Sequence, residues 1–251
     1  MHQEVAIIVA GGKGLRLPGD TPKQFIEIGG QPVLMHTINA FQRYSQSLKI
    51  LLVLPSDDFD RWERLCIKYH FDKKVSVIAG GPTRFQSVKN GLNSITGHGL
   101  VAVHDGVRPL VTPEIIAASF DMARKYRSAV ASVPLKESIR ELRTSTTDAT
   151  DVLTNDFIRA NDLSGGLSFA VDRTRFRVMQ TPQTFDIDLL RAAYDSAKDD
   201  TFTDDASVVE HAGHNIALFD GSYENLKITT PVDLVVAEAI IQSRKQIQSK
   251  H

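Results

Sequence analysis

Five short apolar runs recur along the chain, each separated from the next by a segment of helical length. They span residues 5–9, 50–54, 75–78, 100–103 and 130–133. The runs are nearly continuous rather than alternating, which is expected when helices cover both faces of a parallel sheet. The pattern predicts repeated βαβ units and therefore an α/β fold: a Rossmann-like, mostly parallel sheet with helices on both faces.

The intervening segments carry helical apolar stripes and helix-start signals. One stripe is Leu34, Ile38 and Phe41, and a second is Val88, Leu92 and Ile95. This i, i+4, i+7 spacing places one face of each segment in the core.

Two Thr-Pro pairs predict helix starts, with threonine as N-cap and proline at the first helical position. They are Thr112-Pro113 and Thr230-Pro231. For the last helix, which the second pair opens, we expect an apolar face formed by Val235, Val236, Ala239 and Ile240.

The βαβ pattern stops within residues 136–172. Residues 144–151 are polar throughout and show no periodicity. A structureless segment of this length inside a compact fold is usually functional or disordered. Residues 152–158 and 169–171 have the composition to pair as an extended β-arm, and a mobile surface loop is the alternative. The domain prediction is one domain over residues 1–251 with an arm, residues 136–172, inserted in it.

Composition narrows the class of partner. The 251 residues include 29 basic and 30 acidic side chains, a formal charge of -1, and 42% apolar residues. Without a basic surface or a cationic amphipathic segment, neither nucleic acid nor a membrane is expected as a partner. The single cysteine, Cys66, excludes an internal disulfide, and no leader precedes the first apolar run. We therefore expect a cytoplasmic protein that acts on a small molecule.

A glycine loop with three cations follows the first apolar run directly. Gly11, Gly12 and Gly14 let backbone N–H groups approach an anion, while Lys13, Arg16 and Lys23 supply positive charge. This combination favours a polyphosphate site over an ordinary strand-to-helix turn.

The loop differs from two common nucleotide motifs. No Ser or Thr follows Lys13, as the Gly-x-x-x-x-Gly-Lys-Ser/Thr motif requires. Leu17 stands where the dinucleotide motif Gly-x-Gly-x-x-Gly has its third glycine, so the loop predicts against an oxidoreductase.

Further polar residues follow other strands, at the sheet edge where α/β proteins bind ligands. Gly80 and Gly81 expose backbone suited to a planar base, with Arg84 and Ser87 on the next turn. A plain turn before a helix is the alternative. Asp105 follows a buried run and needs a cation, either magnesium brought by a triphosphate or Arg108 in a salt bridge.

Three other polar residues occupy less specific positions. His104 has no second ligand at useful spacing and is expected to be structural. If Leu226 and Ile228 point into the core, Lys227 points the opposite way and can reach a phosphate. Arg173 follows Asp172, and a surface ion pair is its plain interpretation.

Taken together, the motifs resemble the 2-C-methyl-D-erythritol 4-phosphate cytidylyltransferase family over most of the chain, from about residue 5 to 240. The resemblance is carried by Ala10-Gly11-Gly12-Lys13-Gly14-Leu15-Arg16, Pro22-Lys23-Gln24, His104-Asp105-Gly106-Val107-Arg108-Pro109, Thr181-Pro182-Gln183, Thr203-Asp204-Asp205-Ala206-Ser207 and Asn225-Leu226-Lys227-Ile228-Thr229.

The resemblance implies transfer of a cytidylyl group from CTP to 2-C-methyl-D-erythritol 4-phosphate, with release of pyrophosphate, in non-mevalonate isoprenoid biosynthesis. Arg16 and Lys23 would stabilise the transition state, and Arg173 and Lys227 would position the attacking phosphate. Asp105 would hold Mg²⁺ or another divalent cation. The implied CTP-binding residues are Ala10, Gly11, Gly12, Lys13, Gly14, Gly80, Gly81, Arg84, Ser87 and Asp105.

The resemblance also implies a homodimer in which the arm of one subunit reaches the substrate site of the other. Arg108 and Ser138 would contact the polyol phosphate, together with Arg173 and Lys227. The chain departs from the family pattern at Ser138, where threonine is common, and in the length of the arm. Gly106-Val107 replaces two alanines and resembles ribitol 5-phosphate cytidylyltransferases, the nearest alternative. A non-catalytic nucleotide sensor is the remote one.

Overall fold

The computed structural model describes residues 3–11, 21–142 and 168–248. The chain divides into two compact units. The first combines residues 1–132 with 179–251, and the second is residues 133–178, a range that includes the segment predicted as an arm. Among the described helices, none is long and apolar enough to span a membrane.

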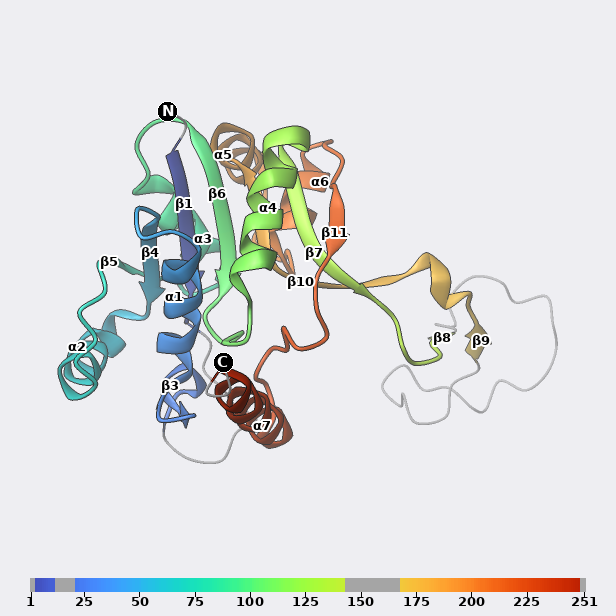
Figure 1. The fold of residues 1–251 in the computed structure, drawn as a ribbon. Helices are drawn as coiled ribbons and strands as arrows, with labels where there is room; N and C mark the ends of the chain where they lie inside the picture. Colours follow the sequence, from blue (N-terminus) through green and yellow to red (C-terminus); the bar gives the residue numbers. More distant parts are fainter. Residues whose placement is uncertain (1–2, 12–20, 143–167, 249–251) are drawn as a thin grey trace, which may run out of the picture. The chain divides into compact units, whose positions relative to one another are not determined.

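A seven-stranded sheet forms the centre of the first unit, in the order β11-β7-β10-β6-β1-β4-β5 (Figure 1). Its strands are β1 (Gln3–Val9), β4 (Lys49–Leu54), β5 (Val75–Ala79), β6 (Gly99–Asp105), β7 (Ser128–Pro134), β10 (Arg177–Asp186) and β11 (Leu218–Asp220). β1 pairs in parallel with β4 and β6, β4 with β5, and β7 with β11. The predicted mostly parallel α/β sheet is confirmed, and β10, antiparallel to β6, is the exception.

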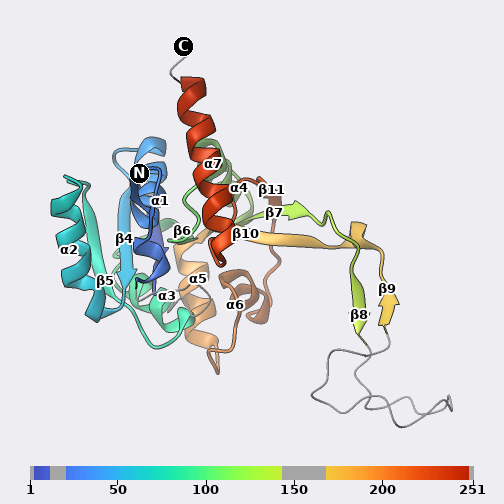
Figure 2. The ribbon, with the colours of Figure 1, turned by 90° about the horizontal axis from the view of Figure 1, so that it is seen from below.

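Helices cover both faces of this sheet. One core cluster holds residues of α1 (Val33–Tyr44), α2 (Phe59–Lys68) and α4 (Pro113–Tyr126). The other holds residues of α3 (Arg84–Asn93), α5 (Ile187–Ser196) and α6 (Asp205–His211). Figure 2 shows α3, α5 and α6 on one side of the strands, with α1 and α4 on the other.

The two clusters explain the continuous apolar runs. In β1, Ala6 and Ile8 belong to the first cluster, whereas Val5 and Ile7 belong to the second. All four are fully buried. Successive side chains of a strand point to opposite faces, so a strand covered on both faces has no side chain that faces solvent. Its residues are therefore apolar one after another.

Capping side chains fix the helix starts. Thr112 accepts a hydrogen bond from the Ile115 amide, and Pro113 follows at the first position of α4, as predicted. Thr83 caps α3 and Asp204 caps α6 in the same way. These caps satisfy amides that have no partner within the helix.

Of the predicted apolar face of α7 (Pro231–Gln248), Ile240 packs against the core as expected, but Val235, Val236 and Ala239 are exposed. Val235 and Val236 are 70% and 42% exposed, whereas Ala237 and Ile241 are buried against Ile28 and Val33. Apolar residues occur on both sides of this helix, so periodicity alone does not identify the packed face.

The second unit contains a two-stranded antiparallel ribbon, β8 (Arg140–Leu142) with β9 (Ser168–Ala170). The strand that includes Phe169 therefore pairs with residues 140–142. Residues 152–158, its predicted partner, lie outside the described residues.

A small hairpin lies between the glycine loop and α1 in the sequence. Side chains of α7 are hydrogen-bonded to it. It consists of β2 (Glu27–Ile28) and β3 (Gln31–Pro32), and follows a 3₁₀ turn, η1 (Lys23–Phe25). Glu238 accepts the Gly29 amide at 2.5 Å, and Lys245 donates to the Gly29 carbonyl at 2.8 Å. Gly29 has φ +57°, and a Cβ there would lie 2.6 Å from Ile241 Cγ2.

Gly29→Ala should therefore lower the free energy of unfolding by about 2–3 kcal/mol, because it combines a left-handed backbone with a clash. Gly30→Ala is the matched control, since Gly30 also has positive φ but nothing within 4 Å of its Cβ position. Chemical denaturation of both variants checks this. Equal losses would mean that the contact with Ile241 contributes nothing.

Candidate active site

A cavity of about 280 Å³ opens beside the carboxyl end of β6. Segments far apart in the sequence line it: Arg84, Asp105, Arg108, Met179, Gln180, Thr181, Gln183, Thr203, Asp204 and Lys227. Four of these were proposed from sequence, and the structure brings them together. A larger hollow of about 430 Å³, near Lys49 and Lys74, lies at the amino ends of β4 and β5, away from the edge where such sheets bind ligands.

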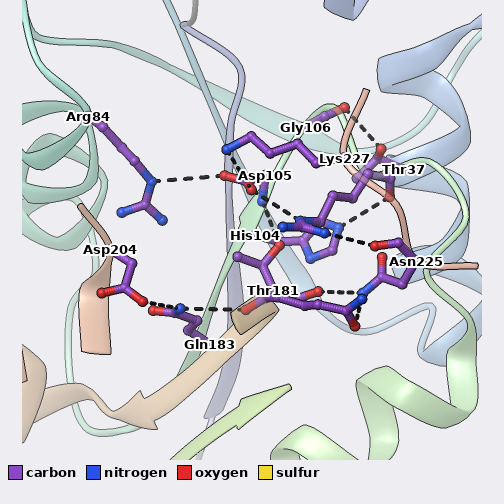
Figure 3. Close-up of polar contacts among 12 residues, drawn as sticks. Thr37, Arg84, His104, Asp105, Gly106, Thr181, Gln183, Asp204, Asn225 and Lys227 are labelled. Atoms are coloured by element: carbon purple, nitrogen blue, oxygen red, sulfur yellow. Dashed lines mark hydrogen bonds and ion pairs between the residues drawn. The ribbon is translucent and has the colours of Figure 1, made fainter. Parts of the chain in front are cut away.

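Asp105 is the centre of this site. Its residue is 8% exposed, and its carboxylate contacts three cations. Lys227 Nζ and Arg108 Nε lie 3.1 Å and 3.2 Å from Oδ2, and Arg84 Nε lies 3.9 Å from Oδ1. The salt bridge between Asp105 and Arg108 is thus present. Figure 3 shows Arg84 and Lys227 also directed at Asp105.

The surrounding charges keep Asp105 ionised. Burial alone would raise the pKa of its carboxyl group, but Lys227, Arg84 and Arg108 outweigh burial and hold the pKa well below its usual range. A buried carboxylate requires such partners because an isolated charge loses its hydration. The site therefore has an ionised Asp105 held among three cations, one of which, Arg84, also pairs with Asp205.

Backbone contacts place two of the cations. The Ile228 amide donates to the Val107 carbonyl at 2.9 Å, and Ile228 is fully buried, so Lys227 points away from the core as predicted. This segment is irregular rather than a strand. Arg108 Nη1 donates to the Asn225 carbonyl at 2.8 Å.

The residues proposed to bind the nucleoside, which are Gly80, Gly81, Arg84 and Ser87, lie together at the start of α3. Ser87 Oγ accepts the Gly81 amide at 3.1 Å and lies 2.9 Å from the Thr83 carbonyl, to which it donates. The Gly80 amide donates to the Leu54 carbonyl at 2.7 Å. A Cβ at Gly81 would lie 2.5 Å from Gln86 Cβ, so glycine there is required by packing.

The glycine loop is described only at its edges. The Ala10 amide donates to the Val53 carbonyl at 2.9 Å, and a Cβ at Gly11 would lie 4.0 Å from Ser87 Oγ. The loop thus begins beside α3. Lys23 is half-buried at the start of η1. Four other proposed residues lie outside the described residues: Gly12, Lys13, Gly14 and Arg16.

Two proposed substrate residues belong to the second unit. Arg173 begins a 3₁₀ turn, η3 (Arg173–Arg175), is exposed, and donates to the Lys136 carbonyl. Asp172 accepts the Thr174 amide at 3.0 Å and caps this turn. Ser138 is exposed. Their roles stay predictions.

His104 is structural in its contacts. It is fully buried, its ring lies edge-on to Phe41, and its Nε2 lies 3.4 Å from the Arg108 carbonyl. Burial lowers the pKa of His104 to about 3, so the ring is neutral at physiological pH. A neutral ring at this position adds no charge next to Asp105.

Comparison with known proteins identifies the family. The family model for 2-C-methyl-D-erythritol 4-phosphate cytidylyltransferase matches residues 4–243. The chain belongs to this family.

Individual relatives agree in sequence and in fold. Proteins with that name from Bacteroides thetaiotaomicron and Porphyromonas gingivalis are both 46% identical to this chain; each alignment covers 96% of this chain, and 100% and 99% of the relatives. The crystal structure of the enzyme of that name from Thermus thermophilus is similar with a TM-score of 0.73 at 28% identity, covering 96% of this chain and 100% of that chain.

A solved 4-diphosphocytidyl-2C-methyl-D-erythritol synthase from Anaerococcus prevotii gives a TM-score of 0.75 at 27% identity, covering 96% of this chain and 99% of that chain. Fold and family thus agree with the resemblance found in the motifs. The chain is a nucleotidyltransferase of the methylerythritol phosphate cytidylyltransferase family.

Several polar residues that organise this cytidylyltransferase site were not assigned roles from sequence. Gln183 is buried; its Oε1 accepts the amides of Asp205 and Ala206 at 3.0 Å and 2.9 Å, and its Nε2 donates to Asp204. Asn225 Nδ2 donates to the Thr181 carbonyl at 2.8 Å. The motifs Thr181-Pro182-Gln183 and Asp204-Asp205 mark these segments in the sequence. Neither motif indicates which residues will be hydrogen-bonded to its side chains in the fold.

Among the described residues, Asp105 and Asp204 are the carboxylates that line the cavity, and Asp204 already accepts hydrogen bonds from Gln183 and the Ser207 amide. The described residues contain no group of three or more His, Cys, Asp or Glu side chains that could by itself hold a metal ion. Mg²⁺ at nucleotide sites takes most of its ligands from phosphates and water, with one or two carboxylates from the protein. Asp105, ionised and at the cavity wall, fits that limited role.

Asn225→Ala should lower the free energy of unfolding by about 2 kcal/mol, because it leaves the buried Thr181 carbonyl without its donor. Asn90→Ala is the control, since Asn90 donates to the Ala79 carbonyl at 2.9 Å on the exposed surface and should lose about 1 kcal/mol or less. Denaturant titrations of both variants measure the difference. A larger loss at Asn90 would contradict this account of the site.

Proposed function

We propose that this chain transfers the cytidylyl group of CTP to 2-C-methyl-D-erythritol 4-phosphate and releases pyrophosphate, a step of isoprenoid precursor biosynthesis. The observation that carries the proposal is the convergence of Arg84, Arg108 and Lys227 on Asp105 in one cavity. Membership of the cytidylyltransferase family supports the substrate assignment.

The reaction depends on neutralising negative charge rather than on transferring a proton. The nucleophile is a phosphate that is already anionic at neutral pH, so no general base is needed. Two polyanions must approach each other, and positive groups fixed in place lower the cost of the charge that develops. Lys227 and Arg108 are set to hold the phosphate of the acceptor, and Arg84 lies on the nucleotide side with Gly80, Gly81 and Ser87.

The remaining roles rest on the family resemblance. Arg16 and Lys23 stabilise the negative charge at the α-phosphorus, and Arg173 aligns the acceptor phosphate with Lys227. Gly11, Gly12, Lys13 and Gly14, with Ala10, bind the CTP phosphates.

A divalent cation, magnesium for preference, supplies further neutralisation of the triphosphate when it is bound. Asp105 is the residue that would hold it. The three cationic partners of this carboxylate are divided between its two oxygens, with Lys227 and Arg108 at Oδ2 and Arg84 at Oδ1.

The protein is proposed to work as a homodimer in the cytoplasm, with the segment of residues 136–172 serving as the arm. Ser138 and Arg173 would then complete the substrate site of the partner subunit. Neither nucleic acid nor a membrane is part of the proposal; the formal charge of -1 supports both exclusions.

Ribitol 5-phosphate is the second candidate acceptor, because Gly106-Val107 resembles the enzymes that use it. Packing offers another reason for Gly106. A Cβ there would lie 2.8 Å from Ala10 Cβ and 3.1 Å from Leu34 Cδ1, so alanine would require these neighbours to shift. Gly106 therefore favours neither acceptor, and methylerythritol phosphate remains the proposed one.

The direct test is pyrophosphate release from CTP and Mg²⁺ with the two acceptors in parallel. Methylerythritol phosphate should give a kcat/KM about a hundredfold above that of ribitol phosphate, within the range of roughly 10- to 200-fold that one extra or missing carbon gives in a fitted pocket. Equal rates would contradict the acceptor assignment. No release with either acceptor would contradict the proposed activity.

Lys227→Ala should lower kcat about a hundredfold, corresponding to ~3 kcal/mol of transition-state stabilisation, while the affinity for CTP stays within about threefold. Steady-state kinetics and CTP calorimetry measure the two effects separately. Lys49→Ala, at the exposed amino end of β4, is the control and should keep wild-type rates. Equal losses of CTP affinity and turnover would contradict a transition-state role for Lys227, and a wild-type chain that binds CTP without any turnover would be better described as a nucleotide sensor.

A further inference from the structure

Arg84 is shared between two carboxylates in the nucleotidyltransferase site. Its Nη2 lies 2.6 Å from Asp205 Oδ2, and its Nε lies 3.9 Å from Asp105 Oδ1. The short contact is thus with Asp205. Figure 3 shows Arg84 and Lys227 approaching Asp105 from different sides.

Asp205 is a rigid anchor for this guanidinium. The residue is fully buried at the start of α6, and its amide donates to Gln183 Oε1 at 3.0 Å. The Tyr194 hydroxyl donates to Oδ1 at 2.6 Å. One carboxylate oxygen is therefore engaged by Tyr194 and the other by Arg84, and the backbone behind them is fixed.

The two oxygens of Asp105 differ in their surroundings. Oδ2 has Lys227 and Arg108 within 3.2 Å. Oδ1 has Arg84 at 3.9 Å as its charged neighbour within the described part of the chain. Oδ1 is consequently the oxygen that is open to a ligand, and Arg84 is the group placed to close it.

We propose that Asp205 is a positioning residue that holds Arg84 away from Asp105 Oδ1, so that this oxygen stays available to the divalent cation that accompanies CTP. The inference rests on the proposed function for the presence of that cation. Without the negative charge at Asp205, Asp105 is the one carboxylate partner that Arg84 keeps among the described residues, and Arg84 closes to a charge-assisted hydrogen bond of about 2.8 Å. The cation then has to displace a guanidinium.

Asp200 provides a control that distinguishes the proposed role of Asp205 from general support of helix α3. Asp200 accepts hydrogen bonds from Thr83 Oγ1 at 3.1 Å and from Gln86 Nε2 at 3.3 Å. It thereby holds the first turn of the same helix without touching Arg84. Loss of Asp200 should loosen the helix start but leave the pairing of Arg84 unchanged.

Asp205→Asn tests the proposal, because asparagine keeps the size of the side chain and an acceptor for Tyr194 but removes the charge. The measurement is CTP binding by calorimetry as a function of Mg²⁺. We expect the Mg²⁺ concentration for half-maximal CTP affinity to rise about tenfold, the scale of coupling within one ion-pair network. In EDTA the CTP affinity should stay within about threefold of wild type, and Asp200→Asn should keep the wild-type response to Mg²⁺.

A suppressor variant gives the sharper result. In Asp205→Asn with Arg84→Ala the competing guanidinium is gone, so the Mg²⁺ midpoint should return to within about threefold of wild type even though CTP binds more weakly. A purely structural Asp205 would leave the double variant as impaired as the single one. The double variant also avoids the unpaired buried carboxylate of Arg84→Ala alone, and thermal unfolding verifies that each variant is folded.

An unchanged Mg²⁺ midpoint in Asp205→Asn, a failure of the double variant to recover, or wild-type CTP binding that is independent of Mg²⁺ would each overturn the inference. These readouts are of binding and do not require turnover. A wild-type protein that binds CTP with Mg²⁺ but transfers no cytidylyl group would instead contradict the proposed function and leave the role of Asp205 standing.

Discussion

The structure depends on how one buried carboxylate is neutralised. Asp105 ends the fully buried strand β6, where a charge without partners would be costly. Three cations from separate segments of the chain meet that need: Arg84 from α3, Arg108 from the loop after β6, and Lys227 from the segment before α7. The carboxylate therefore gathers three cationic side chains in one pocket, and side chains of this kind suit phosphate groups.

The interactions that stabilise the fold also set the geometry of the site. Asn225 joins the Lys227 segment to β10, and its carbonyl receives Arg108. Thr37 of α1 donates to the Gly106 carbonyl at 3.0 Å, and the Gly106 amide donates to the Val9 carbonyl at 2.8 Å. The loop after β6 is thus held from both sides. Groups fixed in this way need little rearrangement as charge develops, which is the basis of electrostatic catalysis.

Much of the parallel sheet follows from the sequence, because strands buried on both faces must be apolar throughout. Five apolar runs correspond to β1, β4, β5, β6 and β7, with bounds extended by one to three residues. β10 was not predicted. Its buried positions include Gln180, Thr181, Gln183 and Thr184, whose polarity is satisfied by partners from distant segments. A polar strand of this kind has no local signal.

The candidate site, like the sheet, could be predicted from the sequence only in part. Asp105, Arg108, Arg84 and Lys227 were found because each follows or precedes a recognisable strand or helix, and ligand sites gather at strand ends. The engagement of Arg84 by Asp205 was not foreseen, since the two are 121 positions apart and each is compatible with a plain helix start. Local sequence identifies charged groups, but the sharing of one guanidinium between two carboxylates is decided by tertiary packing.

The central claim is that Asp105 exchanges part of its protein partners for the nucleotide and its cation. A crystal structure with CTP and Mn²⁺, located by anomalous scattering, tests it most directly. We predict a metal ion bound to Asp105 Oδ1 at about 2.1 Å, close to the Mg²⁺–oxygen distance, with Arg84 still paired to Asp205. A metal ion bound elsewhere, with Asp105 unchanged among its cations and no phosphate in the cavity, would contradict it.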